Sequence, residues 1–324
     1  MTDVFEMDPA AFGKVAVLMG GLSAEREVSL KSGAAVLESL QRQGVDAHGV
    51  DVGRDIASVL LEGEFDCAFI ALHGRRGEDG VMQGLLETLN IPFTGSGVLG
   101  SALSMDKVRS KQVWLSAGLP TPKFVQLHEA TDWNAVVADL GLPLAVKPVH
   151  EGSSLGAARV ENAADLEPAW REAVAFDAAV MAEPWIMGEE YTVGILADEA
   201  LPVIRLETPR EFYDYQAKYK ADDTRYHCPA GLDAETEKAM QTLALQAFNA
   251  LGATGWGRID LMLDADGKPW LLENNTVPGL TDHSLVPMAA KAAGIEFDEL
   301  VLRILSATSV SGVSDVMGEI SHGC

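Results

Sequence analysis

The sequence of 324 residues is short of cysteine, of aromatic side chains and of positive charge. Its three cysteines, Cys67, Cys228 and Cys324, lack the close spacing of metal ligands, which predicts a reducing compartment without a disulfide framework. Lysine and arginine number 24 against 48 acidic residues, and the net charge of −24 would repel nucleic-acid phosphates. No nucleic-acid partner is therefore expected, and an anionic substrate would need cations gathered at its site.

Long apolar runs are also absent, although 48% of the residues are hydrophobic. No run reaches the roughly 20 residues that cross a bilayer. The acidic N-terminus, residues 1–14, lacks the pattern of a signal peptide. The length suits two or three domains. We therefore expect a cytoplasmic protein with no membrane partner.

The stretch from Gly255 to Ser284 reads as two strands joined by a tight turn at Asp266-Gly267, a dipeptide favoured in two-residue hairpin loops. With that turn, Asp260 faces Glu273 and Arg258 faces Asn275. All four side chains then share one face of the hairpin, because side chains alternate along a strand. Leu271 falls on the same face. The other face is predicted to be apolar and buried, with Ile259, Leu261, Leu263, Trp270 and Leu272.

Two carboxylates at directly opposed strand positions repel each other unless a cation lies between them. Mg²⁺ usually binds one or two carboxylates together with phosphate oxygens and water. Asn275 can add a neutral oxygen, so Asp260, Glu273 and Asn275 are predicted to bind a divalent metal. The alternative is a solvated acidic face on which Arg258 pairs with Asp260.

The hairpin, RIDLMLD…LLENNTVPG…HS, resembles the catalytic hairpin of the ATP-grasp ligases, and among them that of the D-alanine–D-alanine ligases. The motifs GGLSAEREVS, HGRRGEDG and KPVHEGSSLG extend the resemblance over nearly the whole chain. It implies an α/β protein with an ATP-grasp fold that is α+β in its C-terminal half. The implied parts are a Rossmann-like parallel-sheet domain at 1–104, two subdomains that enclose ATP at 105–188 and 189–308, and a disordered tail at 309–324.

A glycine pair, Gly20-Gly21, follows a buried strand at 14–19 and precedes a helix, an arrangement that can bind an anion. It also leaves open a dinucleotide-dependent oxidoreductase, although the G-x-G-x-x-G pattern is absent. The resemblance instead implies that Glu25 meets the ammonium group of the first amino acid. His73 ends the strand at 66–72, where ligands of open α/β sheets collect, and either contacts substrate or caps the next helix.

The loop at 150–156, HEGSSLG, is longer than an ordinary hairpin loop, and its N–H and hydroxyl groups are predicted to wrap phosphates. The resemblance assigns nucleotide binding to Lys107, Lys147, Ser154, Glu183, Trp185, Ile186, Glu190 and Lys218. In that assignment the lysines neutralise the phosphates. Glu183 accepts from the adenine amino group and Glu190 from the ribose hydroxyls, while backbone groups of Trp185 and Ile186 contact the adenine edge.

The resemblance also implies a reaction. ATP and two D-alanines would give D-alanyl-D-alanine, ADP and phosphate through a D-alanyl phosphate, for peptidoglycan precursor synthesis. ATP is then a co-substrate with two Mg²⁺ or Mn²⁺ ions, and a homodimer is expected. The alternatives are a ligase that makes D-alanyl-D-lactate or D-alanyl-D-serine, and a nucleotide-binding protein without turnover.

The remaining roles follow from the same resemblance. Ser153 lies over the reacting phosphoryl group, and Tyr219 faces the second substrate and contacts Ser153 and Glu25. The long loop at 212–231 closes over the site as a lid. Preorganised donors are needed for the tetrahedral oxyanion, and the second carboxylate fits a helix N-terminus. The residues implied for these two tasks are Arg258 with the N–H of Gly279, and Ser284 with the N–H of Leu285.

Three positions depart from the pattern of the resembled family. Val277 precedes Pro278, where serine or leucine is often found. Asn274 stands where many members carry alanine or valine, and it points to the core face, so it needs a partner or a place at the sheet edge. Arg76 stands where glycine is common.

Overall fold

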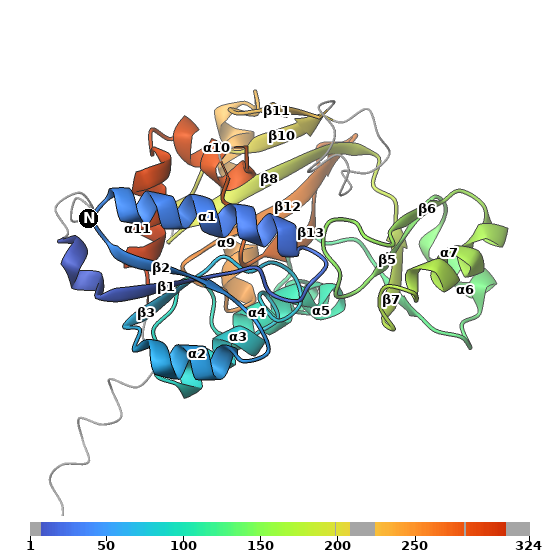
Figure 1. Cartoon of the computed structure of the whole chain (residues 1–324). Coiled ribbons are helices and arrows are strands. Elements are labelled where there is room, and N and C mark those ends of the chain that lie inside the picture. The colour runs from blue at the N-terminus through green and yellow to red at the C-terminus, as the bar shows by residue number, and fades with distance from the viewer. Residues whose placement is uncertain (1–7, 198, 208–223, 282, 309–324) are drawn as a thin grey trace, which may run out of the picture.

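The computed structural model describes residues 8–197, 199–207, 224–281 and 283–308. Within them the strands form three sheets, which follow one another along the chain as the colours of Figure 1 show. The first sheet is parallel and the other two are antiparallel, so the predicted α/β class with an α+β C-terminal half is confirmed. None of the helices in this described part combines the length and apolar character needed to cross a bilayer.

The first sheet has the strand order β2-β1-β3. Its central strand β1 is buried because its residues from Val15 to Leu18 are all apolar. Parallel strands need crossover connections, which α1 and α2 supply. The elements in chain order are η2 (Pro9–Phe12), β1 (Lys14–Met19), α1 (Arg26–Arg42), β2 (Asp46–Asp51), α2 (Ile56–Gly63), β3 (Cys67–Ile70), α3 (Val81–Thr88) and α4 (Val98–Met105).

The second sheet has the strand order β4-β7-β5-β6 and a core of its own around Leu144, Val146 and Leu166. In Figure 1 this sheet and its helices α6 and α7 project to the right of the rest of the molecule. The loop between β5 and β6 contains residues 150–156, which we call the flap. The elements are α5 (Lys107–Ser116), β4 (Val125–Leu127), α6 (Trp133–Leu140), β5 (Leu144–Pro148), β6 (Ala158–Val160), η3 (Ala163–Asp165), α7 (Leu166–Ala173) and β7 (Val180–Pro184).

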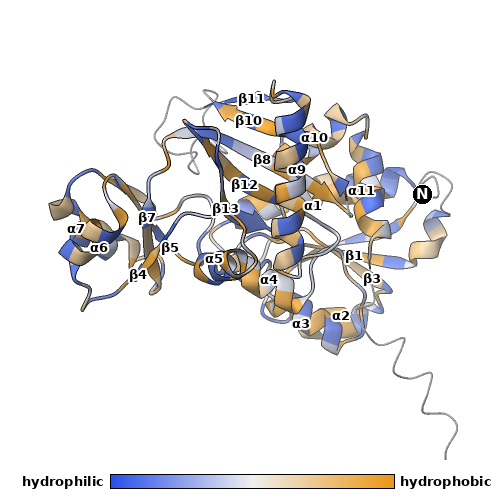
Figure 2. Cartoon of the chain, turned by 180° about the vertical axis from the view of Figure 1, so that it is seen from behind, coloured by the Kyte–Doolittle hydropathy of each residue, from blue (hydrophilic) through white to orange (hydrophobic). Residues whose placement is uncertain are grey.

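The third sheet has the strand order β11-β10-β8-β12-β13, and β9 also pairs with β8. Helix α9 packs on it through Phe248 and Met240, and Figure 2 shows α9 crossing the strands. Helix α11 packs on α1, where Asp298 accepts from Ser39 Oγ at 2.7 Å. The elements are β8 (Gly188–Leu196), β9 (Glu199–Ala200), β10 (Ile204–Glu207), β11 (Arg225–His227), α9 (Ala234–Ala250), β12 (Trp256–Asp264), β13 (Pro269–Asn275), α10 (Leu285–Ala292) and α11 (Phe297–Ser306).

The tip of the β12–β13 hairpin differs from the prediction. The N–H of Asp264 donates to the carbonyl of Lys268 at 3.0 Å, so the loop has three residues and the predicted two-residue turn is wrong. Asp264 Oδ1 accepts from the N–H groups of Asp266 and Lys268, and these bonds favour the wider turn. Gly267 ends the loop at φ 75°, the left-handed position of a three-residue hairpin.

The base of the hairpin agrees with the prediction because a bulge corrects the register. Pairing shifts between Asp260 and Leu261, so Leu261 faces Leu271 while Asp260 still faces Glu273. Leu272 is the extra residue of the bulge. As a result Leu271 is buried in the core and Leu272 lines a cavity, the reverse of the prediction.

Trp270, also predicted for the core, is half-buried instead. Its Nε1 donates to Asp264 Oδ2 at 2.8 Å, and Lys268 Nζ lies 3.9 Å from its ring centroid. The shifted register explains this, since Trp270 faces Met262 on the side that the cavity occupies.

The structure explains one departure from the family pattern and shows why glycine is common at another. Asn274 is buried and its Nδ2 donates to Ser104 Oγ at 2.7 Å, so the expected partner exists. Arg76 has φ 68°, in the left-handed region that glycine occupies at no steric cost.

Candidate active site

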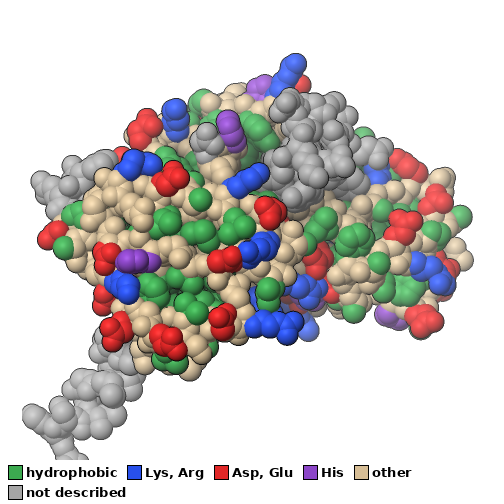
Figure 3. Space-filling view, in the orientation of Figure 1, with side chains coloured by type: hydrophobic (Ala, Val, Ile, Leu, Met, Phe, Trp, Pro, Cys, Tyr) green, Lys and Arg blue, Asp and Glu red, His purple; other side chains and the backbone are tan. Residues whose placement is uncertain are grey.

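A cavity of about 400 Å³ lies between the second and third sheets. Strands β5 and β7 supply one wall, and β8, β12 and β13 supply the other. Nine residues predicted to bind nucleotide or metal line it: Lys107, Lys147, Ser154, Glu183, Trp185, Ile186, Glu190, Asp260 and Glu273. Figure 3 shows Lys and Arg side chains gathered near the centre of the molecule, although the chain has twice as many acidic residues.

Lys147 and Glu183 line the cavity and form an ion-pair cluster with the buried Lys111. Glu183 is 2% exposed and pairs with Lys147 through Oε1 and with Lys111 at 2.7 Å through Oε2. Burial alone would raise the pKa of the Glu183 carboxyl, but the two lysines hold it below its usual range. Burial lowers the pKa of Lys111 to about 8, against the attraction of Glu183.

Lys111 is a residue of this site that the sequence reasoning missed. It is fully buried, and its Nζ also lies 2.7 Å from Thr121 Oγ1. Lys107 and Lys111 are four residues apart on α5 and so share one helix face. That spacing is the signal that could have identified Lys111.

Lys107 connects the flap to the hairpin. Asp106 caps α5 by accepting from the N–H of Arg109 at 2.9 Å, which places Lys107 in the first helical turn. The Nζ of Lys107 donates to the carbonyl of Glu151 at 2.7 Å and lies 3.2 Å from Glu273 Oε2. The ammonium group of Lys107 therefore contacts both the flap and the β12–β13 hairpin.

Asp260 and Glu273 face each other on β12 and β13, as predicted. Arg258 donates from Nε and Nη2 to the two oxygens of Asp260 at 2.8 and 2.7 Å, which is the pairing of the alternative interpretation. Asn275 Nδ2 and Thr192 Oγ1 also donate to Asp260, at 3.1 and 2.6 Å.

The described residues contain no group of three or more His, Cys, Asp or Glu side chains placed to bind a metal. Asp260, Glu273 and the amide oxygen of Asn275 form a mixed set with oxygen donors alone, which suits Mg²⁺. Lys107 and Arg258 balance the two carboxylates in this structure. These residues therefore fit a hard divalent cation with a phosphate group as a further ligand.

Glu25 lies at the N-terminus of α1 and contacts the flap. Its Oε1 accepts from Ser153 Oγ at 2.7 Å. A β-carbon on Gly74 would come within 2.7 Å of Glu25 Oε2, and one on Gly152 within 3.3 Å. The absence of a β-carbon at Gly74 and Gly152 thus leaves room for the Glu25 carboxylate. The structure brings Glu25 and Ser153 together.

His73 is buried and linked to the loop after β13. Its Nδ1 lies 2.9 Å from the carbonyl of Val277, and its Nε2 lies 3.1 Å from Ser32 Oγ. Burial lowers the pKa of the imidazole, although the charge of Glu25 acts in the opposite direction. Gly80, not His73, stands at the N-cap of α3, so the capping alternative is wrong.

Ser284 and Leu285 begin α10, with Ser284 at the N-cap. Ser284 Oγ accepts from the N–H of Thr281 at 3.0 Å. A β-carbon on Gly279 would lie 3.0 Å from the same Oγ, so these three residues form one compact turn. Lys218 and Tyr219 lie outside the described residues, as does the part of the predicted lid at 212–223; the part at 225–227 forms strand β11.

Comparison with known proteins identifies the family. The model for the D-ala D-ala ligase C-terminus matches residues 113–306, and the model for the N-terminus matches residues 52–96. The D-alanine–D-alanine ligase of Nitrosococcus oceani is 63% identical over 302 residues, which cover 93% of this chain and 96% of that protein. The chain belongs to the D-alanine–D-alanine ligase family. The predicted family is confirmed, and with it an ATP-dependent ligase rather than an oxidoreductase.

Other members of the family agree. The D-alanine–D-alanine ligase of Pseudomonas fluorescens is 60% identical over 93% of both chains. The crystal structure of the D-alanine–D-alanine ligase from Bacillus anthracis complexed with ATP matches with a TM-score of 0.81 at 32% identity, covering 91% of this chain and 97% of that one. The VanG D-Ala:D-Ser ligase from Enterococcus faecalis has the same TM-score at 30% identity, covering 91% and 99%. The ATP-grasp fold is thereby confirmed.

A second residue of this ligase that the sequence reasoning missed is Glu78, although the family motif HGRRGEDG contains it. Its carboxylate accepts from the N–H of Gly74 at 2.6 Å and from the N–H of Val277 at 3.4 Å. Burial, together with the charge of Glu25, raises the pKa of Glu78 to about 8. Glu78 thus ties the loop after β3 to the loop after β13.

Proposed function

We propose that the chain joins two D-alanines to D-alanyl-D-alanine, with ATP converted to ADP and phosphate through a D-alanyl phosphate, for peptidoglycan precursor synthesis. One observation carries this proposal. The cavity that gathers Lys107, Lys147 and the paired carboxylates Asp260 and Glu273 opens beside the flap whose Ser153 meets Glu25. Phosphoryl transfer depends on positioning and charge neutralisation, and this arrangement supplies both.

ATP lies in the cavity with its adenine beside Glu183, Trp185 and Ile186. Glu183 accepts from the adenine amino group, and backbone groups of Trp185 and Ile186 contact the adenine edge. Glu190 binds the ribose hydroxyls. The phosphates extend toward Lys107, Lys147 and Ser154, with Lys218 as a further cation in this proposal.

Two Mg²⁺ or Mn²⁺ ions bound by Asp260, Glu273 and Asn275 would neutralise the phosphate oxygens. The chain's own residues do the rest of the positioning. Lys107 keeps the hairpin and the flap together, because its Nζ contacts both Glu273 and the backbone of Glu151. Ser153 lies over the reacting phosphoryl group.

The two D-alanines occupy the space between the flap and the loop after β13. Glu25 and His73 bind the first, with the Glu25 carboxylate meeting its ammonium group. Arg258 and the N–H of Gly279 stabilise the oxyanion that forms when the second amine attacks. The charge of Arg258 acts on both His73 and Glu78, which supports its place at this end of the site.

The carboxylate of the second D-alanine lies at the N-terminus of α10. Ser284 and the N–H of Leu285 bind it there, because a helix N-terminus favours negative charge. Tyr219 faces this substrate, and the loop at 212–231 excludes water from the acyl phosphate. The three parts 1–104, 105–188 and 189–308 are proposed as the units that enclose the substrates.

The proposed setting is the cytoplasm, with the ligase as a homodimer that has no nucleic-acid or membrane partner. Among the described residues, Cys67 and Cys228 carry free thiols, which agrees with a reducing compartment.

The test is ADP release by the full chain with ATP, Mg²⁺ and D-alanine, followed by mass spectrometry of the product. We expect ADP formation that depends on D-alanine and a product of two D-alanyl units, with L-alanine inactive. ATP binding without D-alanine-dependent ADP release would reject the ligase and leave a nucleotide-binding protein.

The second candidate is a D-alanyl-D-serine or D-alanyl-D-lactate ligase, which the likeness to the VanG D-Ala:D-Ser ligase keeps open. Relatives named D-alanine–D-alanine ligase are 56–63% identical, against 30% for VanG, which favours D-alanine as the second substrate. A competition assay with equal D-alanine, D-serine and D-lactate decides, because the dominant product identifies the second substrate.

A further inference from the structure

The flap has a strained backbone conformation that contacts from other segments must stabilise. Ser153 and Ser154 have φ values of 53° and 56°, in the left-handed region where residues other than glycine are strained. Such a conformation persists only where surrounding contacts hold it. Ser153 also donates to Glu25 across the site, so the position of the flap decides whether this bond forms.

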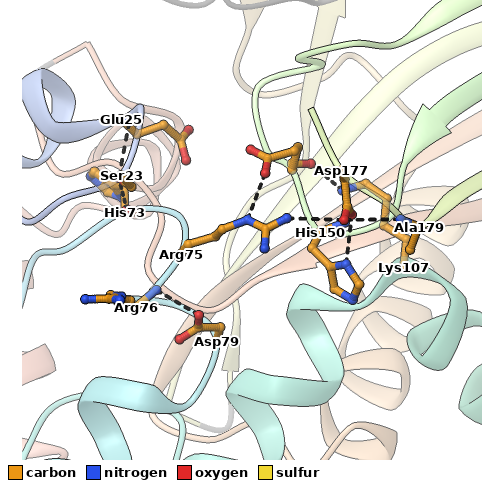
Figure 4. A network of polar contacts seen from close by, with 11 residues as sticks. Ser23, Glu25, His73, Arg75, Arg76, Asp79, Lys107, His150, Asp177 and Ala179 are labelled. Atoms are coloured by element: carbon orange, nitrogen blue, oxygen red, sulfur yellow. Dashed lines mark hydrogen bonds and ion pairs between the residues drawn. The ribbon is translucent and has the colours of Figure 1, made fainter. Parts of the chain in front are cut away.

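Arg75 supplies one such contact from the first part of the chain. It lies in the loop after β3, and its Nε donates to Glu151 Oε1 at 2.9 Å. Its Nη2 lies 3.3 Å from Asp177 Oδ1. Figure 4 shows Arg75 extending toward Asp177, while the side chain of Arg76 extends the other way. Arg75 therefore links the first sheet to the flap and to the segment before β7.

Asp177 is the buried anchor beneath the flap. It is 8% exposed, and its Oδ2 accepts from the N–H of His150 and lies 2.8 Å from Nδ1 of the same residue. The Nε2 of His150 lies 3.4 Å from Oδ2 of Asp106, the cap of α5. The next residue, Lys107, donates to the carbonyl of Glu151. Arg75, His150 at the start of the flap, and Lys107, which is proposed to bind phosphate, thus belong to one chain of contacts.

We propose that Arg75 is a positioning residue that fixes the flap in its closed form over the ATP phosphates, with Ser153 against Glu25. The inference rests on the proposed function, since ATP is the ligand over which the flap closes. The Arg75 side chain is half exposed, and Asp177 keeps its contacts with the N–H and the ring of His150 when Arg75 is removed. Its loss should therefore change nucleotide binding and turnover, and leave the melting temperature unchanged.

The test compares Arg75→Gln with Arg76→Gln, a matched control that removes the same charge from the neighbouring residue. The affinity for a non-hydrolysable ATP analogue is measured by calorimetry, and kcat and the KM for ATP are measured by ADP release. Two charge-assisted contacts are lost in Arg75→Gln, so kcat/KM for ATP should fall by at least about tenfold. Arg76→Gln should stay within about twofold of the wild type, and Arg75→Lys should recover part of the loss because it keeps one cation near Glu151.

Equal analogue affinity and equal kcat/KM in Arg75→Gln and Arg76→Gln would overturn the proposal. A lower melting temperature in Arg75→Gln that Arg75→Lys restores without restoring ATP binding would also overturn it, because the role would then be structural. If the wild type binds the analogue but does not ligate D-alanine, the proposed function fails, and the affinities of the two variants still decide on Arg75.

Discussion

Replacement of Lys111 by methionine tests the ion-pair cluster of Lys111, Glu183 and Lys147 beside the nucleotide cavity. Methionine keeps an unbranched apolar side chain and removes the charge. Lys111 is fully buried, and Glu183, its partner at 2.7 Å, is 2% exposed. Removal of one partner from a buried ion pair costs about 3–5 kcal/mol, because the other charge stays buried without it.

The structure places the cost at the lower end of that range. Glu183 keeps Lys147 as a second cation, so its charge is not left without a partner. Thr121 Oγ1 loses Lys111 and still donates to the carbonyl of Leu271 at 2.8 Å. We therefore expect a loss of about 3 kcal/mol, which for a domain of 150–250 residues lowers the melting temperature by roughly 6–12 °C.

The assay is urea and thermal unfolding of the wild type, Lys111→Met, Glu183→Gln and the double variant. The losses of the two single variants should add to more than the loss of the double variant, because the residues contact each other. Lys123→Met is the matched control, since Lys123 pairs with Asp139 on the surface and should cost less than about 1 kcal/mol. Equal losses for Lys111→Met and Lys123→Met would refute the reasoning, as would strict additivity.

Three further predictions concern the hairpin and the flap. Glu273→Gln should lower turnover by about 100-fold, since it removes a proposed metal ligand, and leave the fold intact; unchanged turnover would remove the metal assignment. Arg258→Ala should lower kcat by about 10²–10³, the cost of one oxyanion donor, and an effect confined to ATP affinity, measured by calorimetry, would contradict that role. Hydrogen bonding to Asp106, and to Asp177, raises the pKa of His150 above its ordinary value, so its contribution to stability is complete below about pH 6.5 and is lost as the pH rises through the higher folded-state pKa. The stability difference between the wild type and His150→Gln, from urea unfolding at several pH values, should therefore shrink as the pH rises; a constant difference would contradict this assignment.

Most of the correct predictions came from patterns among residues close together in the sequence. The turn expected at Asp266-Gly267 put Asp260 opposite Glu273, the alternation of side chains put both on one face, and the glycine-serine run located the flap. The turn was wrong because the side chain of Asp264 accepts two backbone hydrogen bonds and adds a residue to the loop. That error was cancelled by a bulge at Leu272, which alternation alone does not reveal.

The residues that sequence reasoning missed act through contacts distant in the chain. Lys111 meets Glu183 across 72 positions of sequence, and Glu78 meets Val277 across 199. Arg75 likewise reaches Glu151 from another sheet. A charged residue within a helix or a polar loop is usually solvated, so only the folded arrangement distinguishes these three from ordinary surface charges.

The bulge at Leu272 has a consequence for how this hairpin can be altered. Because one extra residue absorbs the mismatch between tip and base, the tip is free to change length on the outer side of Leu261 while the two carboxylates keep their alignment. Deletion of Leu272 would remove the bulge and leave Asp260 opposite Glu273 and Leu261 opposite Leu271, at the cost of one side chain that lines the cavity. The distal loop beyond Asp264 is thus a tolerant place to graft a reporter.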